Sequence, residues 1–298
     1  MMRRELSDSR QQQNRTCSPF ILCSLTFLAA STVVASGQSA DNQRQAITQQ
    51  QMKIPPARRN TDSLQHAPLS FALKKPPALD SVDPAVFSHG PRDRKAVALT
   101  FDACSTHKPS HYDERITKIL IETKTPATLF LGGKWMEEES EQTKYLASIT
   151  HFELANHTFL HLHLKEVSDQ RIRQELLWTQ EVMYSLTGKQ PTLFRAPYGE
   201  YDDRVVRIAS SLGLRTIQFD LASGDPDSNI TKEKLIEYVT SMARNGSIIV
   251  LHINRRGWHT AEALPEIIAR LRKRGFTFMT VSEMLSLHTE EKMKRAKE

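Results

Sequence analysis

One long stretch near the N-terminus has no charge: no Asp, Glu, Lys or Arg occurs between Thr16 and Ala40. The 15 residues before it carry four arginines and two acids. A basic leader, an apolar core and small residues at Val33 and Ala35 predict a secretory signal that is cut near Ala35. An uncleaved signal-anchor is the alternative, because about 20 apolar residues span a bilayer. We therefore expect residues 1–37 to direct export, to the periplasm, the exterior or a membrane tether facing the envelope.

Cysteine is also scarce, with three in 298 residues. Cys17 and Cys23 lie in the predicted leader, so only Cys104 remains after cleavage. A single cysteine excludes an intramolecular disulfide, and the mature fold must depend on its own core. A hydrophobic content of 39% is ordinary for a globular protein with such a core.

The sequence has no basic stripe with interleaved aromatic side chains, although its formal net charge is +6 and its pI is near 9.2. Proteins that bind nucleic acid usually show such a stripe. The mild excess of positive charge therefore indicates a solvated, slightly cationic surface, and we expect no nucleic-acid partner.

Periodic apolar residues are largely missing from residues 38–91, which are rich in Gln, Pro, Ser and charge, and internal repeats are missing altogether. This composition predicts a largely disordered linker. A folded domain is expected over 92–288, followed by a charged tail over 289–298. Membrane attachment would then come only from an uncleaved signal-anchor.

Short apolar runs alternate with helical periods throughout the predicted domain. One helix is expected around Ile116, Ile119 and Leu120, behind a capping box at Ser110 and Asp113. The expected strands cover seven segments: 96–101, 126–131, 152–155, 192–195, 214–220, 247–252 and 276–281. Strands that alternate with helices predict a parallel α/β sheet or barrel, in which chemistry gathers at the carboxyl ends of the strands.

Polar side chains follow five of these strands. Their motifs, in chain order, are Asp102 in "TFDAC", "NHTFLH" (156–161), "FRAPYG" (194–199), "FDLASGDPD" (219–227) and "LHIN" (251–254). Because strands of a parallel sheet end at the same edge, we expect these residues to share one rim.

Each residue type on this rim has a chemical use. His157 and His161 are four residues apart and would face the same way on a local helix, as two imidazole ligands of one metal do. A purely structural role is equally open for this pair. Asp102 is a candidate general base that Arg195 can hold and keep ionised. His252 is either a core histidine or a general acid whose pKa a carboxylate such as Asp225 would raise.

These motifs in this order resemble the NodB-homology polysaccharide deacetylases, over about residues 92–287. The resemblance implies a distorted (β/α) barrel of about seven parallel strands. It also implies metal-dependent hydrolysis of N- or O-acetyl groups on a sugar polymer such as peptidoglycan or a chitin-like oligomer. The expected divalent ion is Zn²⁺, with Co²⁺, Ni²⁺ or Mn²⁺ as alternatives.

The resemblance also assigns roles to individual residues. It implies that Asp102 is the general base, that His157 and His161 are metal ligands, and that Arg195 orients the base. By the same resemblance, Asp225 tunes the general acid His252. Tyr198, next to Pro197, would offer a backbone N–H to the oxyanion. Apart from the resemblance, the aromatic face of Trp258 makes it a candidate for contact with sugar, and a position in a solvated loop is the alternative.

One position departs from the family pattern. The family usually has a second acid directly after the base, as a metal ligand, and here that residue is Ala103. Asp102 can serve the metal itself, or Asp113, His107 or Cys104 can fill the gap. Alternatively the metal is lost and the domain only binds glycan. A third hypothesis, from another class of substrate, is hydrolysis of a small amide.

Overall fold

The computed structural model describes residues 72–106 and 110–287. Helices cover Glu114–Glu122 (α2), Gly133–Glu138 (α3), Ser140–Ser148 (α4), Asp169–Thr187 (α5), Asp203–Ser211 (α6), Lys232–Met242 (α7) and Thr260–Lys273 (α8), with short 3₁₀ turns at Leu164–Glu166 and Pro197–Gly199. Strands cover Val86–Phe87 (β1), Ala96–Ala103 (β2), Ala127–Leu131 (β3), Phe152–Asn156 (β4), Leu193–Phe194 (β5), Arg215–Ile217 (β6), Leu221–Ala222 (β7), Ser247–His252 (β8) and Thr277–Phe278 (β9).

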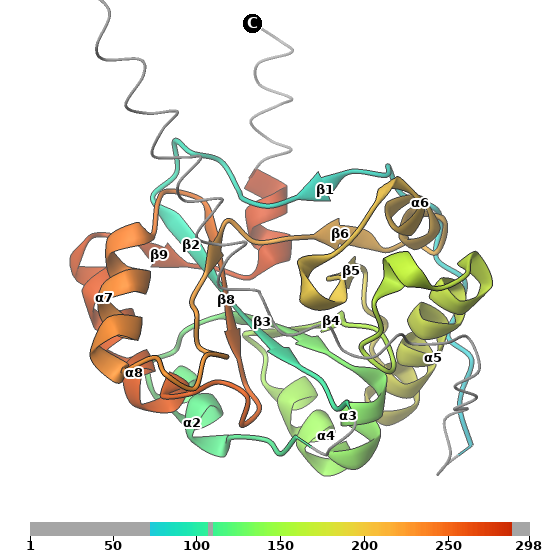
Figure 1. Cartoon of the computed structure of the whole chain (residues 1–298), viewed down its shortest axis with the longest axis horizontal. Helices are drawn as coiled ribbons and strands as arrows, with labels where there is room; N and C mark the ends of the chain where they lie inside the picture. Colours follow the sequence, from blue (N-terminus) through green and yellow to red (C-terminus); the bar gives the residue numbers. More distant parts are fainter. Residues whose placement is uncertain (1–71, 107–109, 288–298) are drawn as a thin grey trace, which may run out of the picture. The chain divides into compact units, whose positions relative to one another are not determined.

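All these strands pair in parallel in one sheet, in the order β1-β6-β5-β4-β3-β2-β8-β7, with β9 beside β2. The helices lie around the strands: α2 packs on α8 and α8 on α7, while α4 and α6 both pack on α5 (Figure 1). β6 and β7 are consecutive in the chain yet lie toward opposite ends of this order, so the sheet curls toward closure. The predicted distorted (β/α) barrel is confirmed.

Of the segment expected as a strand over 214–220, only Arg215–Ile217 (β6) forms one, and β7 begins after the segment, at Leu221. β6 pairs with β5 and β1, whereas β7 pairs with β8, so the three residues between them connect strands that lie toward opposite ends of the sheet order. Asp220 holds this crossing, because its carboxylate accepts a hydrogen bond from the backbone N–H of Ile248 at 2.9 Å and pairs with Arg92 at 2.9 Å. The predicted strand is therefore confirmed only over Arg215–Ile217, and the change of pairing partner after it was not predicted.

The two faces of β2 are buried against different partners. Leu99, Phe101 and Ala103 belong to the cluster that includes the apolar faces of the surrounding helices. Ala98 belongs to a second cluster with Phe130, from the interior of the curled sheet. Alternate residues of a strand point to opposite faces, so Asp102 lies on the interior side and Ala103 on the helix side.

The structured domain begins earlier than residue 92. Val86 and Phe87 pair with β6, and the backbone N–H of Val82 donates to the carbonyl of Ser210 at 3.1 Å. Residues 72–91, which the sequence analysis placed in the linker, therefore pack along the domain. The rest of the predicted linker, the leader and the tail over 289–298 lie outside the described residues.

The start of α2 differs from the predicted capping box. Asp113 itself is the N-cap, and its side chain accepts from the backbone N–H of Arg115 at 3.2 Å. The Asp113 carboxylate also pairs with the Arg115 guanidinium at 2.6 Å. An N-cap carboxylate satisfies a free N–H at the helix start, so Asp113 is committed to α2.

Within residues 72–106 and 110–287, no helix is long and apolar enough to cross a membrane. The predicted signal-anchor over residues 1–37 lies outside this range.

Gly246 precedes β8 and offers a test of the packing at this end of the sheet. Its φ is +71°, and an added Cβ would lie 2.5 Å from the carbonyl oxygen of Gly90 and 2.6 Å from that of Pro91. Gly188, the C-cap of α5, has a similar φ of +68° but open space around it. Left-handed backbone costs a non-glycine residue about 1–2 kcal/mol. We expect Gly188→Ala to lower the free energy of unfolding by that amount and Gly246→Ala by clearly more, as measured by chemical denaturation. Equal losses would contradict this packing.

Candidate active site

Strand register brings the candidate side chains together. Asp102 on β2 is directly beside His252 on β8. Asn156 on β4 pairs with Phe194 on β5, so the residues that follow, His157 and Arg195, also leave neighbouring strands. The rim predicted from the strand ends is therefore present.

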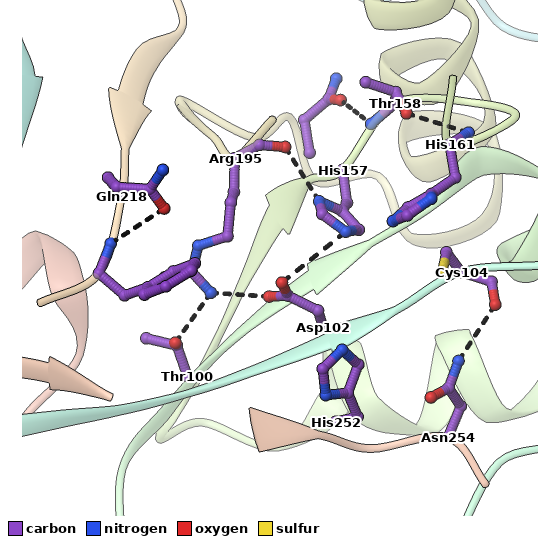
Figure 2. Close-up of polar contacts among 12 residues, drawn as sticks. Thr100, Asp102, Cys104, His157, Thr158, His161, Arg195, Gln218, His252 and Asn254 are labelled. Atoms are coloured by element: carbon purple, nitrogen blue, oxygen red, sulfur yellow. Dashed lines mark hydrogen bonds and ion pairs between the residues drawn. The ribbon is translucent and has the colours of Figure 1, made fainter. Parts of the chain in front are cut away.

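Asp102 and Arg195 form a buried ion pair at the centre of this rim. Arg195 Nη1 donates to Asp102 Oδ1 at 2.7 Å and to Thr100 Oγ1 at 2.9 Å, and the side chains of Arg195 and Asp102 are 1% and 8% exposed (Figure 2). The Arg195 guanidinium lies 3.9 Å from the centre of the Phe130 ring. Burial lowers the pKa of Arg195, and the carboxylate of Asp102 partly offsets this. Because Oδ1 is engaged by Arg195, Oδ2 is the oxygen that faces the rest of the rim.

His157 and His161 lie side by side, but they are not on a helix as the spacing suggested. Thr158 and His161 adopt positive φ values of 63° and 57°, and the loop turns back so that the two ring centroids are 5.0 Å apart. His157 Nδ1 lies 2.9 Å from the carbonyl oxygen of Arg195. A carbonyl can only accept, so Nδ1 carries the proton and Nε2 keeps a free lone pair, 3.7 Å from Asp102 Oδ2.

Burial keeps both of these imidazoles neutral. It lowers the pKa of His157, although the nearby Asp102 works against the shift. Burial lowers the pKa of His161 well below its ordinary value, and the neighbouring His157 lowers it further. Neutral imidazole is the form that binds a metal ion.

A buried pair on α5 holds the loop between these histidines. Glu175 Oε2 accepts from the backbone N–H groups of Phe159 at 2.9 Å and Leu160 at 2.7 Å. Its other oxygen accepts from Arg171 Nη2 at 2.9 Å, and Glu175 is fully buried. Together with the positive φ values, these bonds fix the direction in which the two rings point.

His252 lies beside Asp102, on the neighbouring strand, and is paired with a second carboxylate, that of Asp225. Its Nδ1 lies 2.8 Å from Asp225 Oδ1, and its backbone N–H donates to Asp225 Oδ2 at 2.8 Å. Ser223 and Thr260 donate to the same carboxylate at 2.9 and 2.7 Å. Burial alone would lower the pKa of His252, but the attraction and hydrogen bond of Asp225 raise it above its ordinary value. The pair has the geometry and the charge of a tuned general acid.

The remaining predicted site residues divide between the pocket and its surroundings. Tyr198 lines the pocket with Asp102, His157, His161 and His252, and its ring contacts that of His161 at a centroid distance of 4.5 Å. Pro197 is buried and starts the short turn that carries Tyr198 at a φ of +58°. The side chain of Trp258 is outside the lining and half exposed, and its contact with sugar stays a prediction.

The surroundings of residues 103 and 104 bear on which group could replace the acid that the family usually has after the base. Ala103 is fully buried on the helix side, and its methyl group has no metal-binding atom. Cys104 lines the pocket, two residues after Asp102. Burial raises the pKa of Cys104 to about 12, so it is a poor nucleophile. Asp113 lines a separate groove, and His107 lies outside the described residues.

The imidazole pair fits a divalent ion. His161 is 8% exposed and neither of its ring nitrogens has a hydrogen-bond partner among the described residues, so no such bond competes with a ligand for this ring. Rings at this separation can place one nitrogen each about 2.0–2.1 Å from a shared zinc ion. The set is incomplete, however: in the described part of the chain, no three His, Cys, Asp or Glu side chains already converge tightly enough to hold an ion.

Comparison with known proteins agrees with this geometry. Residues 89–217 match the model of the polysaccharide deacetylase family. A peptidoglycan-N-acetylglucosamine deacetylase from Bacillus cereus is 31% identical over 198 residues, which are 65% of this chain and 90% of the relative. The chain belongs to the polysaccharide deacetylase family. The predicted family, and the class of hydrolases that it defines, are therefore confirmed.

Three further comparisons concern activity and fold. A peptidoglycan-N-acetylmuramic acid deacetylase from Bacillus subtilis is 27% identical, over 75% of this chain and 83% of the relative. A solved CE4 family pseudoenzyme from Bacillus anthracis has a TM-score of 0.63 at 27% identity, over 69% of this chain and 70% of its own. A mutant with restored enzymatic activity gives the same TM-score at 28% identity, covering 69% and 73%.

The deacetylase site also uses residues that the motifs did not reveal. Thr100 helps to hold Arg195, and Thr260 helps to hold Asp225. Ser223 had a local signal, because a serine hydroxyl often bonds the backbone N–H two residues on, and here it accepts from that of Asp225 at 3.2 Å. No local sequence signal marked Glu175, because it lies in the middle of a helix and contacts the histidine loop only in the folded protein.

Glu175→Gln tests the support of the histidine loop. The amide can still accept from the loop, but the ion pair with the buried Arg171 is lost, and breaking such a pair costs about 3–5 kcal/mol. We expect a loss of this size in unfolding free energy together with a weaker affinity for divalent ions, measured by isothermal titration. Glu181→Gln, on the same helix but half buried and away from the loop, is the control and should change neither. Ion affinity that stays at the wild-type level in Glu175→Gln would contradict the supporting role.

Asp225→Asn tests the tuning of His252. The raised pKa keeps His252 protonated to higher pH, so its stabilising charge pair is present below the ordinary histidine pKa and is lost as pH rises through the raised value. Without the carboxylate, we expect the pKa of His252 to fall, as followed by NMR of the ring protons. Asp227→Asn, an exposed acid two residues away, should leave it unchanged. An unaltered His252 titration in Asp225→Asn would rule out this tuning.

Proposed function

We propose that this protein is an exported, metal-dependent deacetylase that removes N-acetyl groups from an amino-sugar polymer of the cell envelope, such as peptidoglycan or a chitin-like glycan. One observation carries the proposal: Asp102 and His252 lie on adjacent strands, each with its own charged partner, and the neutral imidazole pair lies beside Asp102. The relatives named as peptidoglycan deacetylases support the class of substrate. The partner is thus an acetylated polysaccharide or oligosaccharide.

The side chains divide the reaction between them. Asp102, oriented by its ion pair with Arg195, takes a proton from the attacking water. The water oxygen bonds to the acetyl carbon, and the charge that develops on the carbonyl oxygen is met by the backbone N–H of Tyr198. His252 then gives its proton to the sugar nitrogen as the carbon–nitrogen bond breaks, leaving acetate and a free amine.

His157 and His161 would hold the divalent ion, with Zn²⁺ preferred and Co²⁺, Ni²⁺ or Mn²⁺ as alternatives. When bound, the ion supplies Lewis-acid polarisation of the acetyl group and a more acidic water. The surroundings of His252 raise its pKa, whereas those of the imidazole pair lower theirs. One site can therefore hold a proton donor beside neutral imidazoles.

A second candidate function is glycan binding without catalysis. Ala103 favours it, because this side chain cannot replace the usual carboxylate ligand, and solved CE4 pseudoenzymes share the fold at a TM-score of 0.63. This alternative predicts binding of saccharide without release of acetate. The complete Asp102, Arg195, Asp225 and His252 set favours the enzyme.

The deciding assay measures acetate released from peptidoglycan, N-acetylated chitin oligomers and acetylated xylan, with and without a chelator. We expect release from the N-acetylated polymers, loss with chelator and recovery with added Zn²⁺. His252→Ala should lower the rate about 10²–10⁴-fold, the usual contribution of a general acid. His157→Ala should abolish chelator-sensitive activity, while His111→Ala, an exposed histidine in the separate groove, should not. Binding of the polymers with no acetate under any metal would establish the second function instead.

A further inference from the structure

Apart from the two imidazoles, Cys104 is the metal-binding side chain of the pocket whose terminal atom makes no other contact of the kind described above among the described residues. Asp102 is held by Arg195, and Asp225 accepts from Ser223, Thr260 and His252. The Cys104 thiol is free and makes no hydrogen bond with any described group. A buried thiol next to a base and two imidazoles is thus left unused by the proposed reaction.

The backbone fixes Cys104 at the mouth of β2. Its carbonyl accepts from Asn254 Nδ2 at 3.1 Å, which ties residue 104 to the end of β8. In an extended chain, residues two apart point to the same face. Cys104 therefore points to the pocket side with Asp102, whereas Ala103 points to the helix side. Figure 2 shows its sulfur on the side of His161. The side chain is 2% exposed, which shields the thiol from bulk solvent.

An independent observation points to a missing ligand at the same place. His161 is 8% exposed and lines the pocket with Cys104, and neither of its ring nitrogens has a hydrogen-bond partner among the described residues. A buried polar nitrogen without a partner is costly unless a ligand satisfies it. The imidazole and the thiol are both nitrogen and sulfur donors of the type that zinc binds.

We propose that Cys104 supplies the third protein ligand of a divalent ion, as a thiolate beside His157 and His161, at the gap left by Ala103. This inference rests on the proposed metal-dependent function. On binding, the sulfur–metal bond replaces the sulfur–hydrogen bond and the proton leaves to solvent, as it does for coordinating thiols. The cysteine side chain has a single torsion, so the sulfur can turn toward the ion without movement of the backbone.

A thiolate also selects among the ions. Soft sulfur favours Zn²⁺ and Co²⁺ over the oxygen-preferring Mn²⁺. An Asp, His, His set with a carboxylate in the third position would discriminate less. The site is therefore expected to bind Zn²⁺ and Co²⁺ well and Mn²⁺ poorly.

The test is a titration of the metal-free protein with Co²⁺, followed by absorption spectroscopy. Cobalt bound to a thiolate gives a sulfur-to-metal charge-transfer band in the near ultraviolet, which nitrogen and oxygen ligands do not give. We expect one Co²⁺ per chain with this band. In Cys104→Ser the band should disappear and the affinity should fall at least tenfold, and in Cys104→Asp the affinity should return without the band. Melting temperatures and circular dichroism identify any variant that fails to fold.

The outcomes separate this inference from the function on which it rests. Cobalt bound by the wild-type protein without the charge-transfer band overturns the thiolate ligand and leaves a metal-dependent deacetylase. A band that persists in Cys104→Ser also overturns it. If the wild-type protein binds neither Co²⁺ nor Zn²⁺, the metal-dependent function itself fails, and the ligand proposal fails with it.

Discussion

The site depends on one buried arginine. The side chain of Arg195 donates to Asp102, and its backbone carbonyl accepts a hydrogen bond from His157 Nδ1–H, so one residue sets the orientation of the carboxylate and of one imidazole together. Phe130 and Thr100 hold the guanidinium in place. Removing one partner of a buried ion pair leaves an uncompensated charge, which costs about 3–5 kcal/mol. The arginine is therefore tied to stability as well as to geometry, and the site is organised before any ligand arrives.

The alternation of β2 explains why Asp102 can stand next to an alanine. Residues 101 and 103 face the helices, where only apolar groups pack, whereas residues 100, 102 and 104 face the interior and the pocket. The methyl group of Ala103 packs within this helix-side cluster. Asp102 and Cys104 are therefore the residues at this strand end that face the pocket. The packing of the core and the composition of the site are thus set by the same two-residue period.

Much of this was predictable from the sequence, because short apolar runs and their polar ends follow local rules. The seven expected strands, the barrel and the gathering of Asp102, His157, Arg195 and His252 needed only that parallel strands end at one edge. The positive φ values at Thr158 and His161 were not predictable from spacing, since few non-glycine residues adopt them and a β-branched threonine hardly ever does. Glu175 and Thr260 were also out of reach, because they meet the site only through tertiary packing.

The electrostatics of the pocket follow from where the carboxylates are placed. All three histidines are largely buried, and burial alone would make each of them neutral. Asp225 is bonded directly to His252 and overcomes that effect, whereas Asp102 shares its charge with Arg195 and acts on His157 from 3.7 Å, too weakly to reverse it. His161 has no carboxylate partner among the described residues, and His157 lowers its pKa further. One fold thus raises the pKa of one histidine and lowers the pKa of two others around one pocket, and the charge of Arg195 adds to the lowering of the pKa of His157 while that of Asp102 opposes it.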